Sequence, residues 1–307
     1  MAFSHKREPP CKNLETPPKL EKRFNILMDG VLTFLGTGTS MGVPTLGCTC
    51  AVCTSTDPHD RRLRPSVLLR WPGSDGRERV VVIDTGPDFR EQALRNSLRR
   101  VDAVFYTHAH ADHILGLDDL RPLSFAASRA GGPIPLYAEP ETTAALERIY
   151  EYTFSPHSTY PNRARVQLRP LAPVTKVDRV EFVHVPVMHG EMKIAGFRFG
   201  RAAYLTDVSA IPEESFALLH GLDQLVISAL RHQPHPSHAT VEQSLNWARR
   251  IGARHTWFTH ISHDLGHEET NRALPDGVKL AHDGLELPIN LDVPVEPSPN
   301  HPGSVIP

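Results

Sequence analysis

The 307-residue sequence predicts an α/β fold. Two observations lead to this prediction. Short apolar runs rich in Val, Ile and Phe alternate with stretches of helical periodicity, which is typical of β–α units. The strand runs also gather in two clusters, at residues 31–83 and 179–206, and each cluster is followed by β–α units. A chain of this length, 40% of it hydrophobic, is ample for a sizeable core.

The strands are predicted where β-branched and aromatic residues run together, with turn residues at both ends. They are residues 31–35, 66–70, 79–83, 101–106, 135–138, 179–187, a short pair within 197–204, 222–230 and 255–259. Because the loop at 72–76 has strong turn chemistry, we expect the strands on either side of it to pair. Helical periodicity predicts helices at 89–100, 141–152, 241–250 and 268–274. The Asp283-Gly284 dipeptide predicts a hairpin over residues 279–289.

The two ends of the chain differ in composition from its middle. Residues 1–29 combine prolines and charges with little apolar content, so we expect a flexible extension, in which Cys11 is an incidental free thiol. Residues 291–307 are Pro-rich and predict a C-terminal tail. We therefore predict that residues 30–290 form the folded domain.

Charge and cysteine content exclude several classes of protein. A formal net charge of −2 gives no overall attraction to nucleic acid or anionic membranes. No apolar stretch approaches the roughly 20 residues that span a bilayer, and the first thirty residues lack the apolar core of a signal peptide. Four cysteines are too few for a disulfide scaffold. We therefore expect a cytoplasmic protein.

Four candidate metal ligands fall within six residues directly after the predicted strand at 101–106. They are His108, His110, Asp112 and His113. Imidazoles with a carboxylate suit zinc better than magnesium. His108 and His110 project to one side of an extended segment, while Asp112 and His113 begin the next turn and can face a second ion. Two ions roughly 3.5–4 Å apart can share a hydroxide for hydrolysis. The alternative is a His-rich surface loop with incidental metal affinity.

This HxHxDH motif, together with later His, Asp and His positions at strand ends and an opening strand followed by GTGTS, resembles the metallo-β-lactamase superfamily of hydrolases. The resemblance covers roughly residues 30–290. It implies a four-layer αββα sandwich with metals at one edge of the sheets. His189, Asp207 and His260 each follow a predicted strand and match the superfamily's remaining ligand positions.

By this resemblance, two divalent ions, zinc or manganese, occupy the active site. His108, His110 and His189 bind one ion, and Asp112, His113 and His260 bind the other, with Asp207 between them. Asp84, after the strand at 79–83, is expected to organise the metal loop. His238 stands directly before the helix at 241–250 and resembles the catalytic histidine of related phosphodiesterases and tRNA 3′-processing endonucleases.

An unperturbed His238, with a pKa of about 6.5, would suit proton donation to the leaving group or stabilisation of a phosphate oxygen. We count His238 and Asp112 as the catalytic residues. His232 and His235, which lie nearby, are expected to be solvated.

Three further cysteines, Cys48, Cys50 and Cys53, have CxCxxC spacing, which can wrap one tetrahedral ion. A redox-active or structural cysteine cluster is the alternative. With the preceding strand and glycine-rich turn, the stretch resembles the phosphoribosyl 1,2-cyclic phosphate phosphodiesterases of the carbon–phosphorus lyase pathway. That subgroup holds a structural zinc there, and His263 resembles its fourth ligand. A similar cluster occurs in pyrroloquinoline-quinone biosynthesis B proteins.

The resemblance implies a dinuclear phosphodiesterase that hydrolyses a small cyclic phosphate ester. Two other functions stay open: an RNA 3′-end endonuclease, and a non-hydrolytic accessory protein of quinone-cofactor biosynthesis. Thioesters and lactones are open as substrates as well, because a two-metal hydroxide does not choose its electrophile. The expected partner is a small phosphate ester, without membrane or nucleic acid, and a homodimer is left open.

Overall fold

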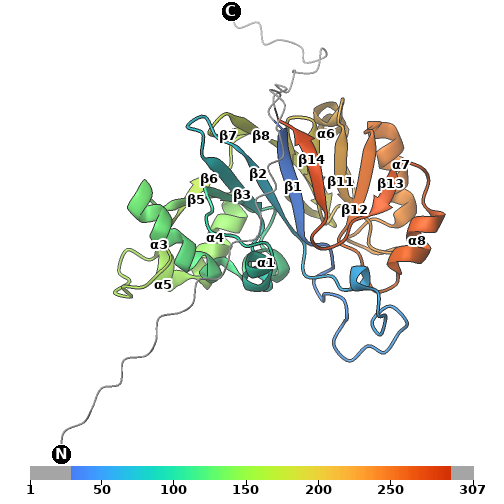
Figure 1. Cartoon of the computed structure of the whole chain (residues 1–307), viewed down its shortest axis with the longest axis horizontal. Helices are drawn as coiled ribbons and strands as arrows, with labels where there is room; N and C mark the ends of the chain where they lie inside the picture. The colour runs from blue at the N-terminus through green and yellow to red at the C-terminus, as the bar shows by residue number, and fades with distance from the viewer. Residues whose placement is uncertain (1–28, 292–307) are drawn as a thin grey trace, which may run out of the picture.

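The structure, a computed structural model, describes residues 29–291 as two facing β-sheets flanked by helices (Figure 1). The first sheet contains, in spatial order, β14 (Glu286–Asn290), β1 (Asp29–Gly36), β2 (Ser66–Pro72), β3 (Glu78–Ile83), β4 (Ala103–Phe105), β5 (Ile134–Ala138) and β6 (Val166–Pro170). The second contains β13 (Val278–Leu280), β12 (His255–Thr259), β11 (Gln224–Ser228), β10 (Ala202–Leu205), β9 (Met192–Phe199), β8 (Val180–His189) and β7 (Val174–Val177). The predicted extension and tail, with Cys11, lie outside the described residues except at residues 29 and 291.

Helices cover the outer faces of both sheets (Figure 1). They are α1 (Phe89–Arg95), α2 (Ala111–Ile114), α3 (Arg121–Ala130), α4 (Pro140–Ile149), α5 (Glu151–Phe154), α6 (Glu213–Phe216), α7 (Val241–Ile251) and α8 (His267–Ala273), with 3₁₀ turns η1 (Pro58–Asp60), η2 (Leu117–Leu120) and η3 (Ala217–Leu219). The fold is α/β, with two facing sheets between layers of helices, as predicted. No helix of the described residues is long and apolar enough to cross a membrane.

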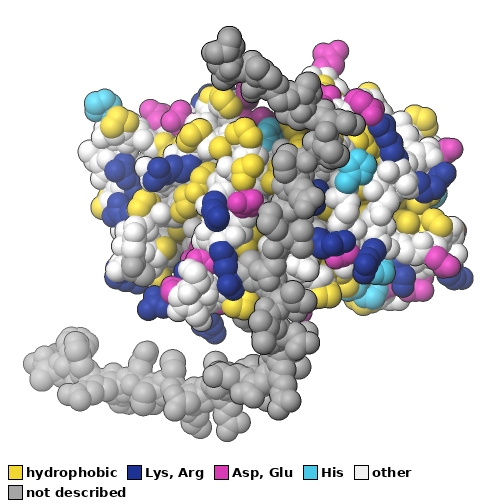
Figure 2. All heavy atoms as spheres, turned by 90° about the horizontal axis from the view of Figure 1, so that it is seen from above, with side chains coloured by type: hydrophobic (Ala, Val, Ile, Leu, Met, Phe, Trp, Pro, Cys, Tyr) yellow, Lys and Arg dark blue, Asp and Glu magenta, His cyan; other side chains and the backbone are white. Residues whose placement is uncertain are grey.

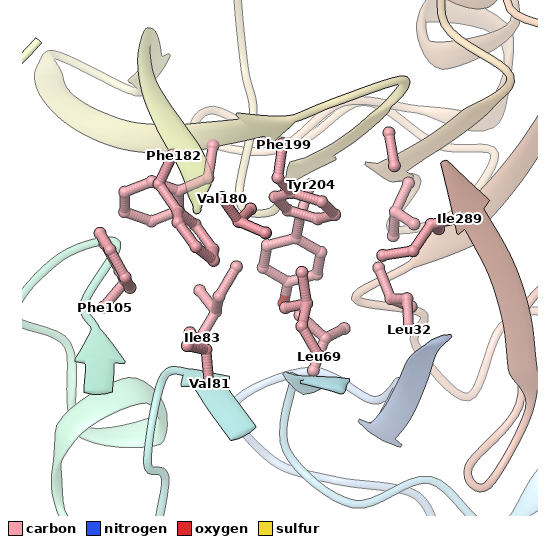
Figure 3. Packing of buried hydrophobic residues seen from close by; sticks show 14 of the residues in the cluster. Leu32, Leu69, Val81, Ile83, Phe105, Val180, Phe182, Phe199, Tyr204 and Ile289 are labelled. Carbon is pink, nitrogen blue, oxygen red and sulfur yellow. The ribbon is translucent and has the colours of Figure 1, made fainter. Parts of the chain in front are cut away.

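Side-chain alternation explains why both faces of the first sheet are buried. In β3, Val81 and Ile83 point into the core between the sheets, while Val80 and Val82 point into the core under the helices. Between the sheets, Phe105 of β4 stacks on Phe182 of β8 with ring centroids 4.4 Å apart (Figure 3). The two sheets therefore share one continuous apolar interior.

Strand direction decides where the polar site forms. Strands β3 to β6 run parallel to one another, and so do β10 to β13. Parallel strands end at the same edge of their sheet. The residues that follow β3 and β4 in the first sheet can therefore meet those that follow β10 and β12 in the second, where the two facing sheets share this edge.

The hairpin predicted over residues 279–289 is wrong. β13 pairs with β12 in the second sheet, whereas β14 pairs with β1 in the first, so the chain crosses between sheets at Asp283-Gly284. The Asp283 carboxylate instead accepts hydrogen bonds from the amide and hydroxyl of Thr37 and from the amide of Leu63. A tight turn is present, but long-range partners decide which strands it joins.

Two predicted helices end early. The helix predicted to reach residue 100 stops at Arg95, where the Asn96 side chain donates to the Gln92 carbonyl and Ser97 adopts a positive φ. The helix predicted at 141–152 is divided at Tyr150 into α4 and α5. Tyr150 donates its hydroxyl hydrogen bond to the Ile114 carbonyl, which ties this break to the turn after the HxHxDH motif.

Candidate metal centre

Three strands end at the shared edge with a polar residue in the left-handed backbone region. Asp84 follows β3 with φ 65°, Asp207 follows β10 with φ 57°, and His260 follows β12 with φ 53°. Non-glycine residues rarely adopt positive φ, and the surrounding structure must stabilise them there. Such strain at three strand ends, one from the first sheet and two from the second, marks a functional site.

The segment with HxHxDH is locked against the loop after β3. The Thr85 amide donates to the His113 carbonyl, and the Gly116 amide donates to the Thr85 carbonyl, both at 2.8 Å. Gly86 lies so close that a Cβ on it would stand 2.0 Å from the carbonyl oxygen of Asp112. A glycine is needed at this position because any side chain would push the ligand segment away.

The predicted ligands converge into two neighbouring groups, in each of which the candidate ligand atoms lie within 4.8 Å of one another. One group is His108, His110 and His189, and the other is Asp112, His113, Asp207 and His260. Asp207 also belongs to a further group with His189 and His238, so it lies between the two sets. Its two carboxylate oxygens face different imidazoles, at 3.2 Å from His113 Nε2 and 3.0 Å from His260 Nε2.

Hydrogen bonds at the outer ring nitrogens leave the inner ones free for a cation. His113 Nδ1 donates to Asp84 Oδ2 at 2.7 Å, and His189 Nδ1 donates to the Ser237 carbonyl at 2.7 Å. The buried Nε2 atoms of His108, His113 and His260 have no hydrogen-bond partner among the described residues. Imidazole nitrogens and carboxylate oxygens arranged in this way fit two divalent ions such as zinc or manganese.

Asp84 lies beside the HxHxDH segment, as expected for a residue that organises this loop. Besides His113, its carboxylate accepts hydrogen bonds at 2.8 Å from the amide and the hydroxyl of Thr107. The side chain is fully buried. It therefore orients the start of the ligand segment and one imidazole at the same time.

The charges of the site depend strongly on one another. Burial alone would lower the pKa of His260, but Asp207 and Asp112 raise it to about 9. Burial alone would raise the pKa of Asp207, yet His260 and His113 hold it well below its usual range. The buried carboxylates thus stabilise positive charge at the point where the ligand atoms converge. A bound metal cation would supply such a charge.

His238 lies beside the ligands, with its ring 4.7 Å from His260 and 4.6 Å from His189 between centroids. Burial and then the nearby His260 lower its pKa to about 3. The expectation of an unperturbed pKa is therefore wrong, and His238 is neutral at pH 7. His232 is exposed as predicted, but His235 is half-buried, with its ring 4.9 Å from that of His238.

Cys48, Cys50, Cys53 and His263 form a second centre. The three sulfurs lie 3.2, 3.4 and 3.4 Å from His263 Nδ1, and the cysteines are free thiols. A tetrahedral ion with three sulfurs and one nitrogen would hold these atoms about 3.5 Å apart. The Thr45 amide donates to Cys53 Sγ, and the Cys53 amide donates to Cys50 Sγ, as expected around thiolates. The arrangement fits a structural zinc.

Arg62 is a buried residue that the sequence did not reveal. Its guanidinium donates to the carbonyls of Ser262 and Leu265 and pairs with Asp60 at 2.9 Å. It thus joins the cysteine loop to the segment after β12, which carries His260 and His263. Nothing local distinguishes Arg62 from a solvated arginine, so only its three-dimensional surroundings identify it.

Outside both centres, His59, His267 and Glu268 also bring candidate ligand atoms within 4.8 Å of one another. The Asn271 amide, whose oxygen accepts from the Leu280 amide, donates to His267 Nε2 at 3.0 Å. The neutral His267 ring therefore carries its proton on Nδ1 and has no free lone pair for a metal. This group packs the end of the cysteine loop against α8.

A model of the Beta-lactamase superfamily domain matches residues 79–261. Among solved structures, the chain is similar to a diphosphatase from the PhnP family, with 54% identity and a TM-score of 0.80 over 87% of this chain and 99% of that one. It shares the fold of zinc-bound PqqB from Methylobacterium extorquens, with 20% identity and a TM-score of 0.64 over 84% of this chain and 99% of that one.

Among characterised sequences, the chain is 36% identical over 260 residues to an octanoyltransferase of Porphyromonas gingivalis. The match includes 83% of this chain and 51% of the other, so this chain spans about half the length of that protein.

Proposed function

The chain belongs to the beta-lactamase superfamily and, within it, to the PhnP family, and we propose that it is a two-metal phosphodiesterase acting on small phosphate esters. One observation carries the proposal. Seven His and Asp side chains from both sheets converge as two adjacent ligand groups joined at Asp207.

Two bound divalent ions would supply an acidified water and would screen the charge of the phosphate. His108, His110 and His189 would hold one ion, and Asp112, His113 and His260 the other. Asp84 and the Ser237 carbonyl keep His113 and His189 in the tautomer that turns Nε2 toward the site. Because His238 is neutral, its role is to donate one N–H to a phosphate oxygen rather than to act as a standing cation.

The proposed substrate is a cyclic phosphate such as phosphoribosyl 1,2-cyclic phosphate, supported by the CxCxxC centre. A diphosphate is the second candidate, because the PhnP-family relative with 54% identity is named a diphosphatase. Both substrates offer a phosphodiester-type centre to the same pair of ions. They differ in the leaving group, which is an alkoxide in the cyclic phosphate and another phosphate in the diphosphate.

An RNA endonuclease is disfavoured by charge. On the face in Figure 2, Lys and Arg side chains are interspersed with hydrophobic and acidic ones, whereas RNA binding favours a continuous basic surface. A non-hydrolytic accessory role is disfavoured because all seven ligand positions are kept. We propose a small-molecule substrate without a nucleic-acid partner, and solution scattering would test the homodimer that the sequence leaves open.

Metal-loaded protein should hydrolyse a generic aryl phosphodiester, and Asp207→Ala should lower turnover by at least about 100-fold, because the group between the two sets of ligands is lost. Asp276→Ala, which removes an exposed carboxylate, is the matched control and should stay near wild type. The assays should include a cyclic ribose phosphate, a diphosphate diester, pre-tRNA and an octanoyl thioester, the last because of the octanoyltransferase relative. Unchanged turnover in Asp207→Ala, or activity restricted to the thioester or the RNA, would contradict the proposal.

A further inference from the structure

We propose that His235 is a specificity-determining residue that binds the outer, unattacked phosphate of a diphosphate substrate. The inference rests on the proposed phosphodiesterase function and selects between its two substrate classes. His235 lies in the loop between β11 and α7 that also carries His238.

This loop is rigid. Its two ends are joined, since the Val241 amide donates to the Arg231 carbonyl and the Leu230 amide donates to the Ala239 carbonyl, both at 3.0 Å. Pro234 and Pro236 flank His235 and restrict the backbone on both sides. A side chain held in this way loses little conformational entropy when it binds a ligand.

Ser237 sets the tautomers of two histidines. Its carbonyl accepts the Nδ1 proton of His189, which leaves His189 Nε2 for the metal. Its amide donates to His235 Nδ1 at 3.3 Å, so the neutral His235 ring carries its proton on Nε2. No hydrogen bond to His235 Nε2 occurs within residues 29–291, so this N–H is available to an acceptor.

The rings lead outward from the ligands. His260 is buried, His238 lies 4.7 Å from it between centroids, and His235 lies 4.9 Å from His238 and is half-exposed. A phosphate attacked next to His238 would therefore place a second phosphate, one bridging oxygen away, toward His235. The alkoxide of a cyclic ester has no anionic group to fill that position.

The surroundings of His235 favour an anion. Arg231 donates to the carbonyls of Gln233 and Pro234 and has no carboxylate partner among the described residues. Burial lowers the pKa of His235, and so do the charges of Arg231, His189 and His260. His235 is thus a neutral donor in a region of positive potential, which suits a phosphate oxygen.

The test measures binding of imidodiphosphate and of orthophosphate to the manganese-loaded full chain by calorimetry. His235→Leu should weaken imidodiphosphate binding about 10- to 100-fold, as expected for one hydrogen bond to a charged group, and should change orthophosphate binding less than about twofold. His235→Gln, which keeps an N–H near the Nε2 position, should restore most of the affinity. His232→Leu, an exposed histidine on the same loop, should bind both probes like wild type.

Equal weakening for both probes, no weakening, or a Gln variant as weak as the Leu variant would overturn the proposal. In steady state, His235→Leu should raise KM for a diphosphate diester more than it raises KM for an aryl phosphodiester. The binding measurement does not depend on turnover. If the wild-type protein hydrolysed no phosphodiester, the proposed function would be refuted, but the binding data would still decide the role of His235. Metal content and Tm of the variants, measured in parallel, identify a merely structural defect.

Discussion

His238 shows at the scale of one residue how its surroundings override intrinsic chemistry. A free imidazole titrates near pH 6.5, but burial and the neighbouring His260 lower the pKa of His238 to about 3. In the proposed reaction, His238 would therefore act as a neutral hydrogen-bond donor. Its position before α7, where Thr240 forms a capping box with Gln243, keeps the ring beside the ligands.

His238→Ala should lower turnover on an aryl phosphodiester by about 10²–10³-fold, the usual effect of removing one donor to a developing charge. Metal content, measured by elemental analysis, should stay at the wild-type value because His238 lies outside both main groups of ligands. His232→Ala is the control. Loss of metal together with activity would mean that His238 is a ligand, and an equal defect on every substrate in His235→Ala would mean that the wrong histidine was chosen.

His267 gives the stability a pH dependence. It is 5% exposed, and burial, followed by the nearby His59, lowers its pKa to about 4. Between pH 4 and 6.5 the unfolded chain binds a proton that the folded chain does not. The stability that His267 contributes is therefore complete above pH 6.5 and is lost as the pH falls toward 4.

From pH 7.5 to 5, this single group should lower the free energy of unfolding by about 2 kcal/mol. His267→Gln keeps an acceptor for the Asn271 amide but cannot titrate, so urea unfolding of this variant should depend less on pH by that amount. Measuring both proteins at saturating zinc, and comparing only their difference, cancels the protonation of the cysteine ligands. Identical pH dependence would show that His267 is not the responsible group.

The cysteine loop acts as a structural element although it contains little regular secondary structure. Between β1 and β2 the chain places three thiols against His263 and one buried arginine against the segment after β12. Burial raises the pKa of Cys53 to about 11, whereas the Cys53 amide lowers the pKa of Cys50 to about 6. Without an ion, the thiols of Cys50 and Cys53 would therefore ionise at very different pH values. Zinc, which binds thiolates, should organise all of them together.

Cys50→Ser should bind one zinc fewer than the wild type, which should carry about three metals per chain with both centres full. Its Tm should fall by about 5 °C or more, because metal binding and folding of this loop are coupled. Cys11→Ser controls for loss of a cysteine as such and should keep the wild-type metal content. A redox cluster would instead show an unchanged metal count in Cys50→Ser and a reversible disulfide among Cys48, Cys50 and Cys53.

The whole molecule is stabilised by the interior that the two sheets share (Figure 3). The labelled residues of the first sheet are Leu32, Leu69, Val81, Ile83, Phe105 and Ile289, and those of the second sheet are Val180, Phe182, Phe199 and Tyr204. The candidate metal ligands come from the ends of both sheets, so this core also sets the distance between His113 and Asp207. Stability and site geometry are therefore linked.

A matched pair of Leu→Ala variants tests this. Leu69 is 0% exposed in the shared core, and Leu94 is 65% exposed on α1. Leu69→Ala should lower the free energy of unfolding by about 2–5 kcal/mol because it leaves a cavity, whereas Leu94→Ala should change it by less than about 0.5 kcal/mol. Equal losses in urea unfolding would contradict the placement of the core between the sheets.

The α/β class, most strands and the residues of both candidate centres could be predicted from the sequence. These are local properties: apolar alternation, turn chemistry, and ligand-type side chains at short spacing such as HxHxDH and CxCxxC. His189, Asp207, His260 and His263 were found because each stands at or just beyond the end of a recognisable strand and matches an ordered motif. Their convergence follows from parallel strands that end at one edge.

Tertiary structure alone decided the rest. The chain crosses between sheets at Asp283 because that carboxylate binds Thr37 and Leu63, which lie far away in the sequence. The pKa of His238 and the tautomer of His235 depend on burial and on partners contributed by other segments or by the folded loop. Arg62 looks like any arginine in the sequence, and only the fold surrounds its side chain with four acceptor oxygens. Local sequence records side-chain chemistry and periodicity, but desolvation and long-range hydrogen bonds exist only once distant segments are brought together.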